Sequence, residues 1–298
     1  MSIVSGTDFS ENADRAARSA AGLAAWLGQP LVLLHVIEPG SARGDPGTIA
    51  SPYAEGARAT LRELAGRLRA RGIEVREEVH PGLADESLLQ CARQHRARTV
   101  VVAALGKRPL GRGRLGSAAE RLVRAGEFPV LVARPCEALE NWEPGGRRLR
   151  ILVGYDSTHA GEAAVHWVAA LRARGPCDGV VAHAYRPYEE AQRLGLHHPA
   201  GPHGGYPEVE MLLERELARR IGTLPGEGET RLLAEPTLSR IASCLLQLAV
   251  RERCDLLVVG THARRGLDRL WHGSVAAEVV EEAPVPVVCV PAEAVPAK

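Results

Sequence analysis

The chain alternates short apolar runs with longer segments in which apolar residues recur at helical spacing. In the first half, the apolar runs predict strands at residues 3–5, 31–36, 73–79, 99–104 and 130–133. Between them, helical periodicity is clearest at Leu61, Leu64 and Leu68, and again around residues 88–92. Runs such as TVVVAAL and DLLVVG are apolar on both faces, which is typical of strands buried between two layers of helices.

The second half of the chain repeats the pattern of the first. Asp8 and Asp156 are 148 positions apart, and the block that begins at Gly116 matches the block that begins at Gly273 at an offset of 157. The apolar runs of the second copy predict strands at residues 151–154, 180–185, 230–234, 256–259 and 287–290. A register of this length indicates a tandem duplication.

The order of these elements predicts the fold class. Strands that alternate with helices, joined by right-handed crossovers, predict two tandem α/β domains, each a doubly wound, Rossmann-like parallel sheet of five strands in the order 3-2-1-4-5. We expect domains at residues 1–139 and 149–298, with the segment 140–148, which contains Pro-Gly-Gly, as linker. The last strand of each copy would otherwise leave an exposed edge, so we expect these two strands to join the copies as a pseudo-dimer. Further homodimerisation of the whole chain is left open.

Two signals far apart in sequence converge on one place in such a sheet. Ligands bind beyond the carboxyl ends of the strands, where the winding reverses between strands 1 and 4. Asp8 and Asp156 follow strand 1 of their copies, and the loop GTHARRGLDRLWHGS follows strand 4, from Gly260 to the helix start at Gly273 and Ser274. A helix N-terminus attracts phosphate, and an aspartate accepts hydrogen bonds from ribose. The sequence therefore predicts a nucleotide site.

These features resemble the universal stress protein family, whose nucleotide signature is Gly-x2-Gly-x9-Gly-Ser/Thr after strand 4, with an aspartate after strand 1. The resemblance covers nearly the whole chain, twice, and implies a tandem member whose halves pair like the family's dimers. It implies ATP or AMP as ligand, with or without Mg²⁺, and a regulatory or protective role in the stress response. It also implies that adenine meets the backbone after the strand 2 histidine, at Val36 and Ala184.

Both copies depart from that signature by one residue. The second copy has Ala263 at the second glycine, and the first has Ala103 at the first glycine. Where a positive φ is needed, one methyl group costs on the order of 1 kcal/mol. We expect the second copy to be the better site, because Gly260 lets the chain pass close to a ligand. The residues implied for the two sites are Asp156, Ala184, Gly260, Ala263, Gly273, Ser274 and Val275 in the second copy, and Asp8, Val36, Gly106, Gly116 and Ser117 in the first.

Other interpretations of the same residues stay open. Serine and aspartate commonly cap helices, and Asp8 followed by Glu11 has the spacing of a capping box. If both loops are relics, the chain is a nucleotide-free interaction module that binds a protein partner. The segment SGTDFS, residues 5–10, is similar to the pyrophosphate loop of ATP-pyrophosphatases, which would make the chain an adenylating enzyme.

Catalytic and metal-binding patterns are not found in the sequence. It has no Walker lysine, magnesium-binding carboxylate pair or triad-like arrangement, so we expect a binding protein rather than an enzyme. His197, His198 and His203 lie in a loop rich in Pro and Gly without a fourth ligand nearby, so no metal site is predicted. His35 and His183 lie inside apolar strands, where we expect packed, hydrogen-bonded residues rather than bases.

Composition and charge limit the kinds of binding partner and the compartment that we expect for this chain. A net charge of +1 gives no bulk attraction to nucleic acid or to a membrane surface. No apolar segment approaches the roughly 18 residues that span a bilayer, and the first residues contain no apolar signal core. The six cysteines are scattered without a Cys-x-x-Cys, which favours reduced thiols. We therefore expect a cytoplasmic protein.

Overall fold

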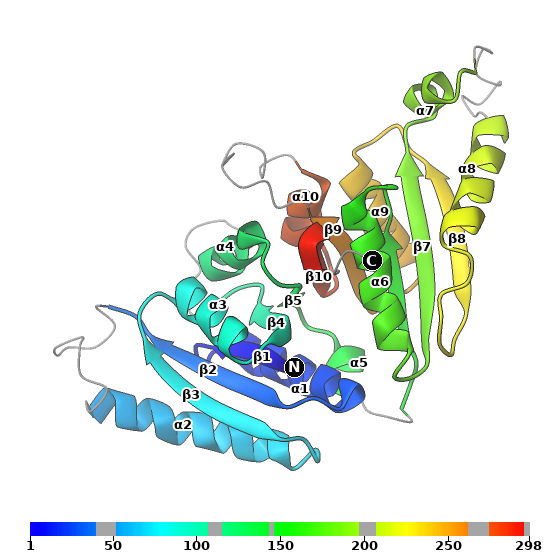
Figure 1. The fold of residues 1–298 in the computed structure, drawn as a ribbon. Coiled ribbons are helices and arrows are strands. Elements are labelled where there is room, and N and C mark those ends of the chain that lie inside the picture. The colour runs from blue at the N-terminus through cyan, green and yellow to red at the C-terminus, as the bar shows by residue number, and fades with distance from the viewer. Residues whose placement is uncertain (40–51, 107–114, 143–145, 197–206, 262–273, 295–298) are drawn as a thin grey trace.

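The molecule consists of two copies of one α/β unit that share a single sheet (Figure 1). The computed structural model describes residues 1–39, 52–106, 115–142, 146–196, 207–261 and 274–294. The first copy and the segment after it contain β1 (Ser2–Thr7), α1 (Glu11–Leu27), β2 (Leu31–Ile37), α2 (Pro52–Arg69), β3 (Val75–Pro81), α3 (Ala84–Gln94), β4 (Ala97–Ala103), α4 (Ser117–Ala125), β5 (Val130–Ala133) and α5 (Glu137–Glu140). The second contains β6 (Leu149–Gly154), α6 (His159–Arg172), β7 (Cys177–Tyr185), α7 (Pro187–Arg193), α8 (Pro207–Arg220), β8 (Thr230–Pro236), α9 (Ile241–Arg251), β9 (Leu256–Thr261), α10 (Val275–Glu282) and β10 (Val287–Pro291).

The strand order confirms the predicted topology. It is β3-β2-β1-β4-β5-β10-β9-β6-β7-β8, so each copy has the order 3-2-1-4-5 with parallel neighbours. The two last strands, β5 and β10, pair antiparallel and join the copies, as predicted. Leu131 lies opposite Val288, and these residues are equivalent at the repeat offset of 157. The pseudo-twofold axis between the copies therefore passes through this pair.

Two layers of helices cover the sheet, and each layer continues across the joint between the copies. Ile3 and Leu131 point into the core formed with α1, α2, α6 and α8. Val4 and Val130 point the other way, into the core formed with α3, α4, α9 and α10. Figure 1 shows β3 and β8 at the two ends of this sheet, with β5 and β10 near its middle. The apolar runs are thus buried on both faces, as their composition predicts.

The connection between the copies begins as packed structure. The carboxylate of Glu140, at the end of α5, is buried and accepts hydrogen bonds from the Arg18 guanidinium of α1 at 2.9 and 3.1 Å. Trp142 is 2% exposed and stacks on Trp26, with ring centroids 3.8 Å apart. Residues 140–142, which the sequence suggested as linker, therefore hold the start of the connection against α1.

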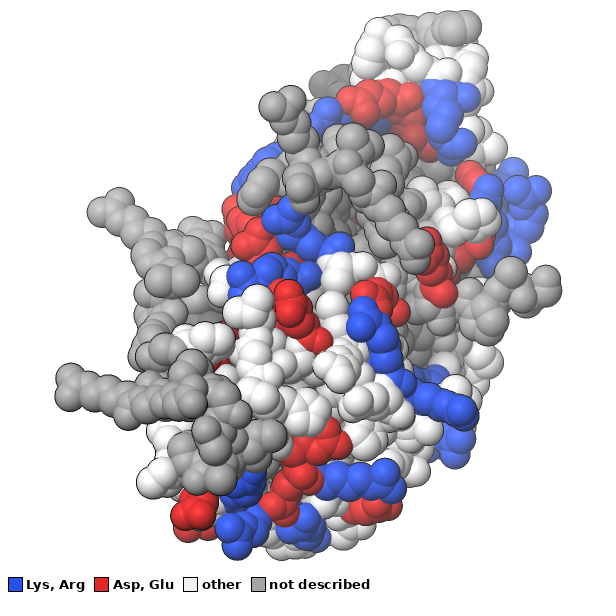
Figure 2. All heavy atoms as spheres, turned by 60° about the vertical axis from the view of Figure 1, so that its left-hand side comes forward, with Lys and Arg blue, Asp and Glu red and all other residues white. Residues whose placement is uncertain are grey.

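The surface charge, the helices and the cysteines of the protein can be compared with the expectations from composition. On the face shown in Figure 2, basic and acidic side chains lie next to one another over much of the surface. No helix within the described ranges is both long and apolar enough to cross a membrane. All six cysteines carry free thiols.

Replacing Trp142 by alanine should remove the stack on Trp26 and leave a cavity beside α1. We expect the free energy of unfolding of the full-length protein to fall by about 3–5 kcal/mol, as measured by urea denaturation. The matched control Trp142→Phe keeps an aromatic ring against Trp26 and should lose less than half as much. An unchanged urea midpoint for Trp142→Ala would contradict the anchoring role.

Candidate functional site

The turn at the carboxyl end of β1 fixes the position of Asp8. Phe9 has a positive φ of 61°, and Asp8 Oδ1 accepts a hydrogen bond from the Ser10 N–H at 3.0 Å. Ser10 then caps α1, with its hydroxyl oxygen accepting from the Ala13 N–H at 3.2 Å. Asp8 is therefore not the capping residue that its spacing from Glu11 suggested. Its carboxylate is held beside the strand end by an Asx turn.

The second copy repeats this turn. Ser157 has a φ of 60°, and Asp156 Oδ1 accepts from both the N–H and the hydroxyl of Thr158, at 3.1 and 2.6 Å. Thr158 caps α6 by accepting from the Gly161 N–H at 3.2 Å. The same local chemistry thus positions one aspartate at the end of the first strand in each copy.

A histidine from the second strand supports each turn. His35 Nδ1 lies 2.8 Å from the Thr7 carbonyl oxygen, and His183 Nδ1 lies 2.9 Å from that of Tyr155. A carbonyl oxygen only accepts, so each Nδ1 carries the hydrogen. These contacts confirm that the two histidines are packed, hydrogen-bonded residues. The half-buried Val36 and Ala184 follow them along the strands.

The glycine turn of the first copy meets Asp8. A methyl group built on Gly106 would lie 2.8 Å from Asp8 Oδ2, so these two residues are in direct proximity. Gly116 returns to the same place, where its N–H donates to the Ala104 carbonyl oxygen at 2.7 Å. A side chain at Gly116 would press against that oxygen. The structure therefore brings Asp8, Gly106 and Gly116 close to one another.

The helix that follows presents its N-terminus at this crevice. Gly116 is the N-cap of α4 and, having no side chain, makes no side-chain capping hydrogen bond. Ser117, the first residue of α4, is exposed. The first N–H groups of a helix have no acceptor within it and carry the positive end of its dipole. Beside Asp8, the crevice thus offers an anion-binding helix end next to a hydrogen-bond acceptor.

The corresponding residues of the second copy differ. Ser274 is the N-cap of α10, and its hydroxyl oxygen accepts from the Ala277 N–H at 3.2 Å. Val275, the first residue of α10, is exposed. Gly260 faces α6 rather than open space, since a methyl group there would lie 2.2 Å from the carbonyl oxygen of Ala160. The missing side chain of Gly260 is therefore a packing requirement.

Several predicted residues lie outside the described ranges. These are Ala263 and Gly273 of the second signature and the histidines of the Pro- and Gly-rich loop, His197, His198 and His203.

A separate cavity of about 380 Å³ lies between α1, α2 and the connection. Its arginines already hold neighbouring elements together. Arg67 pairs with Asp14 at 2.8 Å, and Arg71 donates to the carbonyl oxygens of Glu140 and Trp142 at 2.9 and 3.0 Å. We interpret this cavity as part of the joint between these helices.

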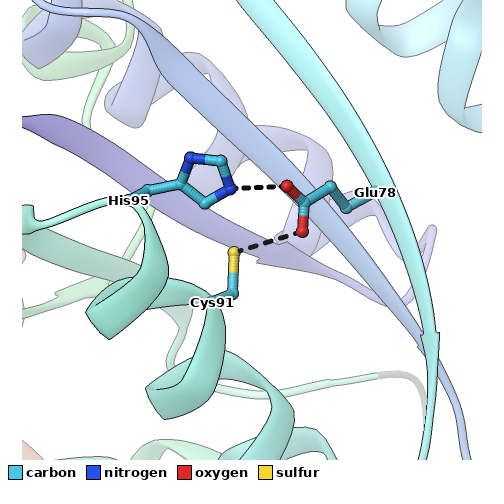
Figure 3. A group of neighbouring side chains, drawn as sticks. All are labelled: Glu78, Cys91 and His95. Carbon is cyan, nitrogen blue, oxygen red and sulfur yellow. Dashed lines mark hydrogen bonds and ion pairs between the residues drawn. The ribbon is translucent and has the colours of Figure 1, made fainter.

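A group of side chains between β3 and α3 was missed in the sequence. The Glu78 cluster consists of Glu78, His80, Cys91 and His95, three of which are drawn in Figure 3. Burial, assisted by the Glu78 carboxylate, raises the pKa of the Cys91 thiol to about 12, so the thiol is protonated at neutral pH. Two spacings could have revealed the cluster: Glu78 and His80 alternate on a strand, and Cys91 and His95 are one helical turn apart.

Comparison with known proteins gives one consistent result. The profile of the universal stress protein family matches residues 1–134 and 148–291. A universal stress protein of Mycolicibacterium smegmatis is 28% identical over 299 residues, which cover 97% of this chain and 96% of that protein. One of Thermus aquaticus is 34% identical over 145 residues, which cover 47% of this chain and 96% of that protein. That relative therefore has about the length of one copy.

A solved structure supports the arrangement of the whole chain. The crystal structure of a universal stress protein from Archaeoglobus fulgidus matches with a TM-score of 0.69 and 17% identity, and the match covers 98% of each chain. At this identity the match supports the fold alone.

The packing of Gly260 can be tested by adding one methyl group. Gly260→Ala should push α6 from β9 and lower the free energy of unfolding by about 1–3 kcal/mol. The control Gly66→Ala adds the same group to the exposed side of α2, where nothing among the described residues outside the adjoining helix backbone lies within 4 Å, and should stabilise by up to about 1 kcal/mol. Urea denaturation measures both. Equal stability of Gly260→Ala and the unmodified protein would refute the packing role.

Proposed function

Because this chain belongs to the universal stress protein family, with two copies of the family's domain, we propose that it is a regulatory or protective protein that binds an adenine nucleotide. We place the nucleotide in the crevice of the first copy. The observation that supports this choice is that Gly106, after β4, lies against Asp8, after β1, and that Gly116, the N-cap of α4, lies beside Gly106.

Each part of a nucleotide has a counterpart in this crevice. The N–H groups at the start of α4 and the Ser117 hydroxyl would bind phosphate. The Asp8 carboxylate would accept hydrogen bonds from ribose. The backbone at Val36, one strand over, would meet adenine, as in the family. In the second copy, the Ser274 hydroxyl already accepts the Ala277 N–H, and this difference favours the first copy.

We further propose that the nucleotide is held rather than turned over. Main-chain donors that bind the phosphate equally in the ground state and the transition state would hold the nucleotide without accelerating its chemistry. Phosphoryl transfer also needs a group that positions the attacking water or hydroxyl. Asp8 is already bonded to the Ser10 N–H and sits where ribose is expected.

Two matched variants test which copy binds. Asp8→Asn keeps the shape of the side chain but removes the charge that would bind ribose. We expect a loss of about 10–100-fold in AMP or ATP affinity by isothermal titration, from about 1.5–3 kcal/mol for a charged hydrogen bond. Asp156→Asn makes the same change in the second copy and should leave the affinity within about twofold.

The outcomes separate the hypotheses. A loss confined to Asp156→Asn would move the nucleotide to the second copy. If no adenine nucleotide binds or raises the melting temperature of the unmodified protein, the nucleotide proposal fails and the interaction module becomes the better account.

Turnover gives an independent check. Purified protein incubated with ATP and Mg²⁺ should release phosphate or pyrophosphate no faster than the Asp8→Asn variant, as followed by a coupled phosphate assay. Release of pyrophosphate that depends on Asp8 and on an acceptor would instead support an adenylating enzyme.

A further inference from the structure

The Glu78 cluster lies two strands from the Asp8 turn, where side chains of the edge strand β3 meet those of α3. Glu78 and His80 alternate along β3 and therefore share one face of the strand. Cys91 is fully buried in α3, and His95 is the C-cap of that helix, one turn later. Figure 3 shows Cys91 and His95 directed at the carboxylate of Glu78.

The donor atoms of Glu78, Cys91 and His95 converge on a small volume. His95 Nε2 lies 2.5 Å from Glu78 Oε1, and Cys91 Sγ lies 3.7 Å from Glu78 Oε2. All three ligand atoms lie within 4.8 Å of one another. Zinc bonds of about 2.0–2.3 Å separate the ligands of a tetrahedral site by about 3.3–3.8 Å. The side chains therefore need to shift by little to surround an ion.

His80 offers a further nitrogen at the same carboxylate. Its Nε2 lies 3.0 Å from Glu78 Oε2. Arg76, which shares this face of β3, pairs with Glu74 at 2.8 Å instead. The described nitrogen-bearing side chains that meet Glu78 here are thus imidazoles, whose neutral nitrogens are common metal ligands.

The second copy shows that the fold does not need such a cluster. The strand register places Leu233 and Glu235 where the first copy has Glu78 and His80. The helices align α9 with α3, so that Leu248 and Glu252 replace Cys91 and His95.

The residues at these positions of the second copy have structural roles, in the apolar core and in ion pairs. Leu233 and Leu248 join the apolar core of that face, and Glu252 pairs with Arg150 and Arg231 at 3.0 and 2.8 Å. At these equivalent positions, the first copy therefore has a thiol and an imidazole facing a carboxylate and a second imidazole, where the second copy has core and ion-pair residues. Packing alone does not require this set.

We propose that the first copy binds one Zn²⁺ ion through the Glu78 carboxylate, the Cys91 thiolate and His95 Nε2, with His80 as the fourth ligand. Thiolate, imidazole and carboxylate are the donors that zinc takes in proteins. On binding, the ion replaces the thiol proton, which passes to solvent together with any proton on His80 Nε2 or His95 Nε2. The ion would fasten α3 to the edge strand. His80 is paired in register with Val36, so the metal would also brace the strand next to the crevice.

The test uses full-length protein freed of metal with a chelator. Zn²⁺ is titrated in competition with a chromophoric chelator, and Co²⁺ serves as the spectroscopic probe. We expect one equivalent of Zn²⁺ per chain and a thiolate-to-cobalt charge-transfer band. Cys91→Ser should abolish the band, and both Cys91→Ser and His95→Gln should weaken Zn²⁺ binding at least about tenfold.

Two controls isolate the cluster. Cys244→Ser removes a buried thiol from α9 of the second copy and should change neither stoichiometry nor spectrum. A variant with His197, His198 and His203 all changed to serine removes the other histidine group and should also bind as the unmodified protein does. If Cys91→Ser does not fold, the His95→Gln variant is used to test the site. Its substitution is at a partly exposed residue at a helix end, so the variant is expected to fold.

The proposal is overturned by any of three results. The protein binds no equimolar Zn²⁺, the cobalt complex lacks a thiolate band, or the triple-histidine variant loses the ion while His95→Gln keeps it. Nucleotide titrations on the same samples can succeed or fail independently.

Discussion

The reversal of winding between β1 and β4 is the constraint from which the proposed site follows. The two strands are parallel neighbours, so their exit turns lie side by side. The chain leaves β1 for α1 on one face of the sheet, whereas the chain that leaves β4 reaches α4 on the other. In doubly wound sheets, ligands bind where two such turns meet. Asp8 and Gly106 face each other there because the topology allows little else.

The antiparallel pairing of β5 with β10 turns two such units into one molecule. It closes an edge that each copy would otherwise expose, and it lets both helix layers continue from one copy to the next. Within this shared scaffold the copies have diverged. Both keep the aspartate turn and its supporting histidine. They differ at the equivalent helices, since Ser274 caps α10 whereas Gly116 is the N-cap of α4, and among the described residues the Glu78 cluster is found in the first copy.

Much of this arrangement could be predicted from the sequence, because it depends on local patterns that repeat. Apolar runs predicted the strands and their burial, and the otherwise exposed edges of the two last strands predicted the joint between the copies. The roles of particular residues were harder to predict. Ser10 rather than Asp8 caps α1, because two residues with capping side chains compete and the turn geometry decides. Gly260 matches a ligand-binding signature, but its missing side chain makes room for the backbone of Ala160 in α6. No local sequence pattern reveals that neighbour.

Long-range contacts account for the other differences. Trp142 follows a short polar segment and precedes Pro-Gly-Gly, so composition suggested a linker, whereas Trp26, over a hundred residues away, draws it into the core. His95 and Glu78 likewise meet only after β3 and α3 have packed. Sequence spacing can predict which face of a helix or strand such a residue lies on. The residue that it contacts on another element is determined by the tertiary fold.

The central claim concerns where a phosphate lies when this protein meets an adenine nucleotide. A crystal structure of the full-length protein grown with AMP tests it most directly. The account predicts electron density for the phosphate at the N–H groups of Ser117 and its neighbours, with ribose oxygens within hydrogen-bond distance of Asp8. Density for AMP elsewhere, or a first-copy crevice filled by the chain's own side chains at saturating AMP, would contradict it.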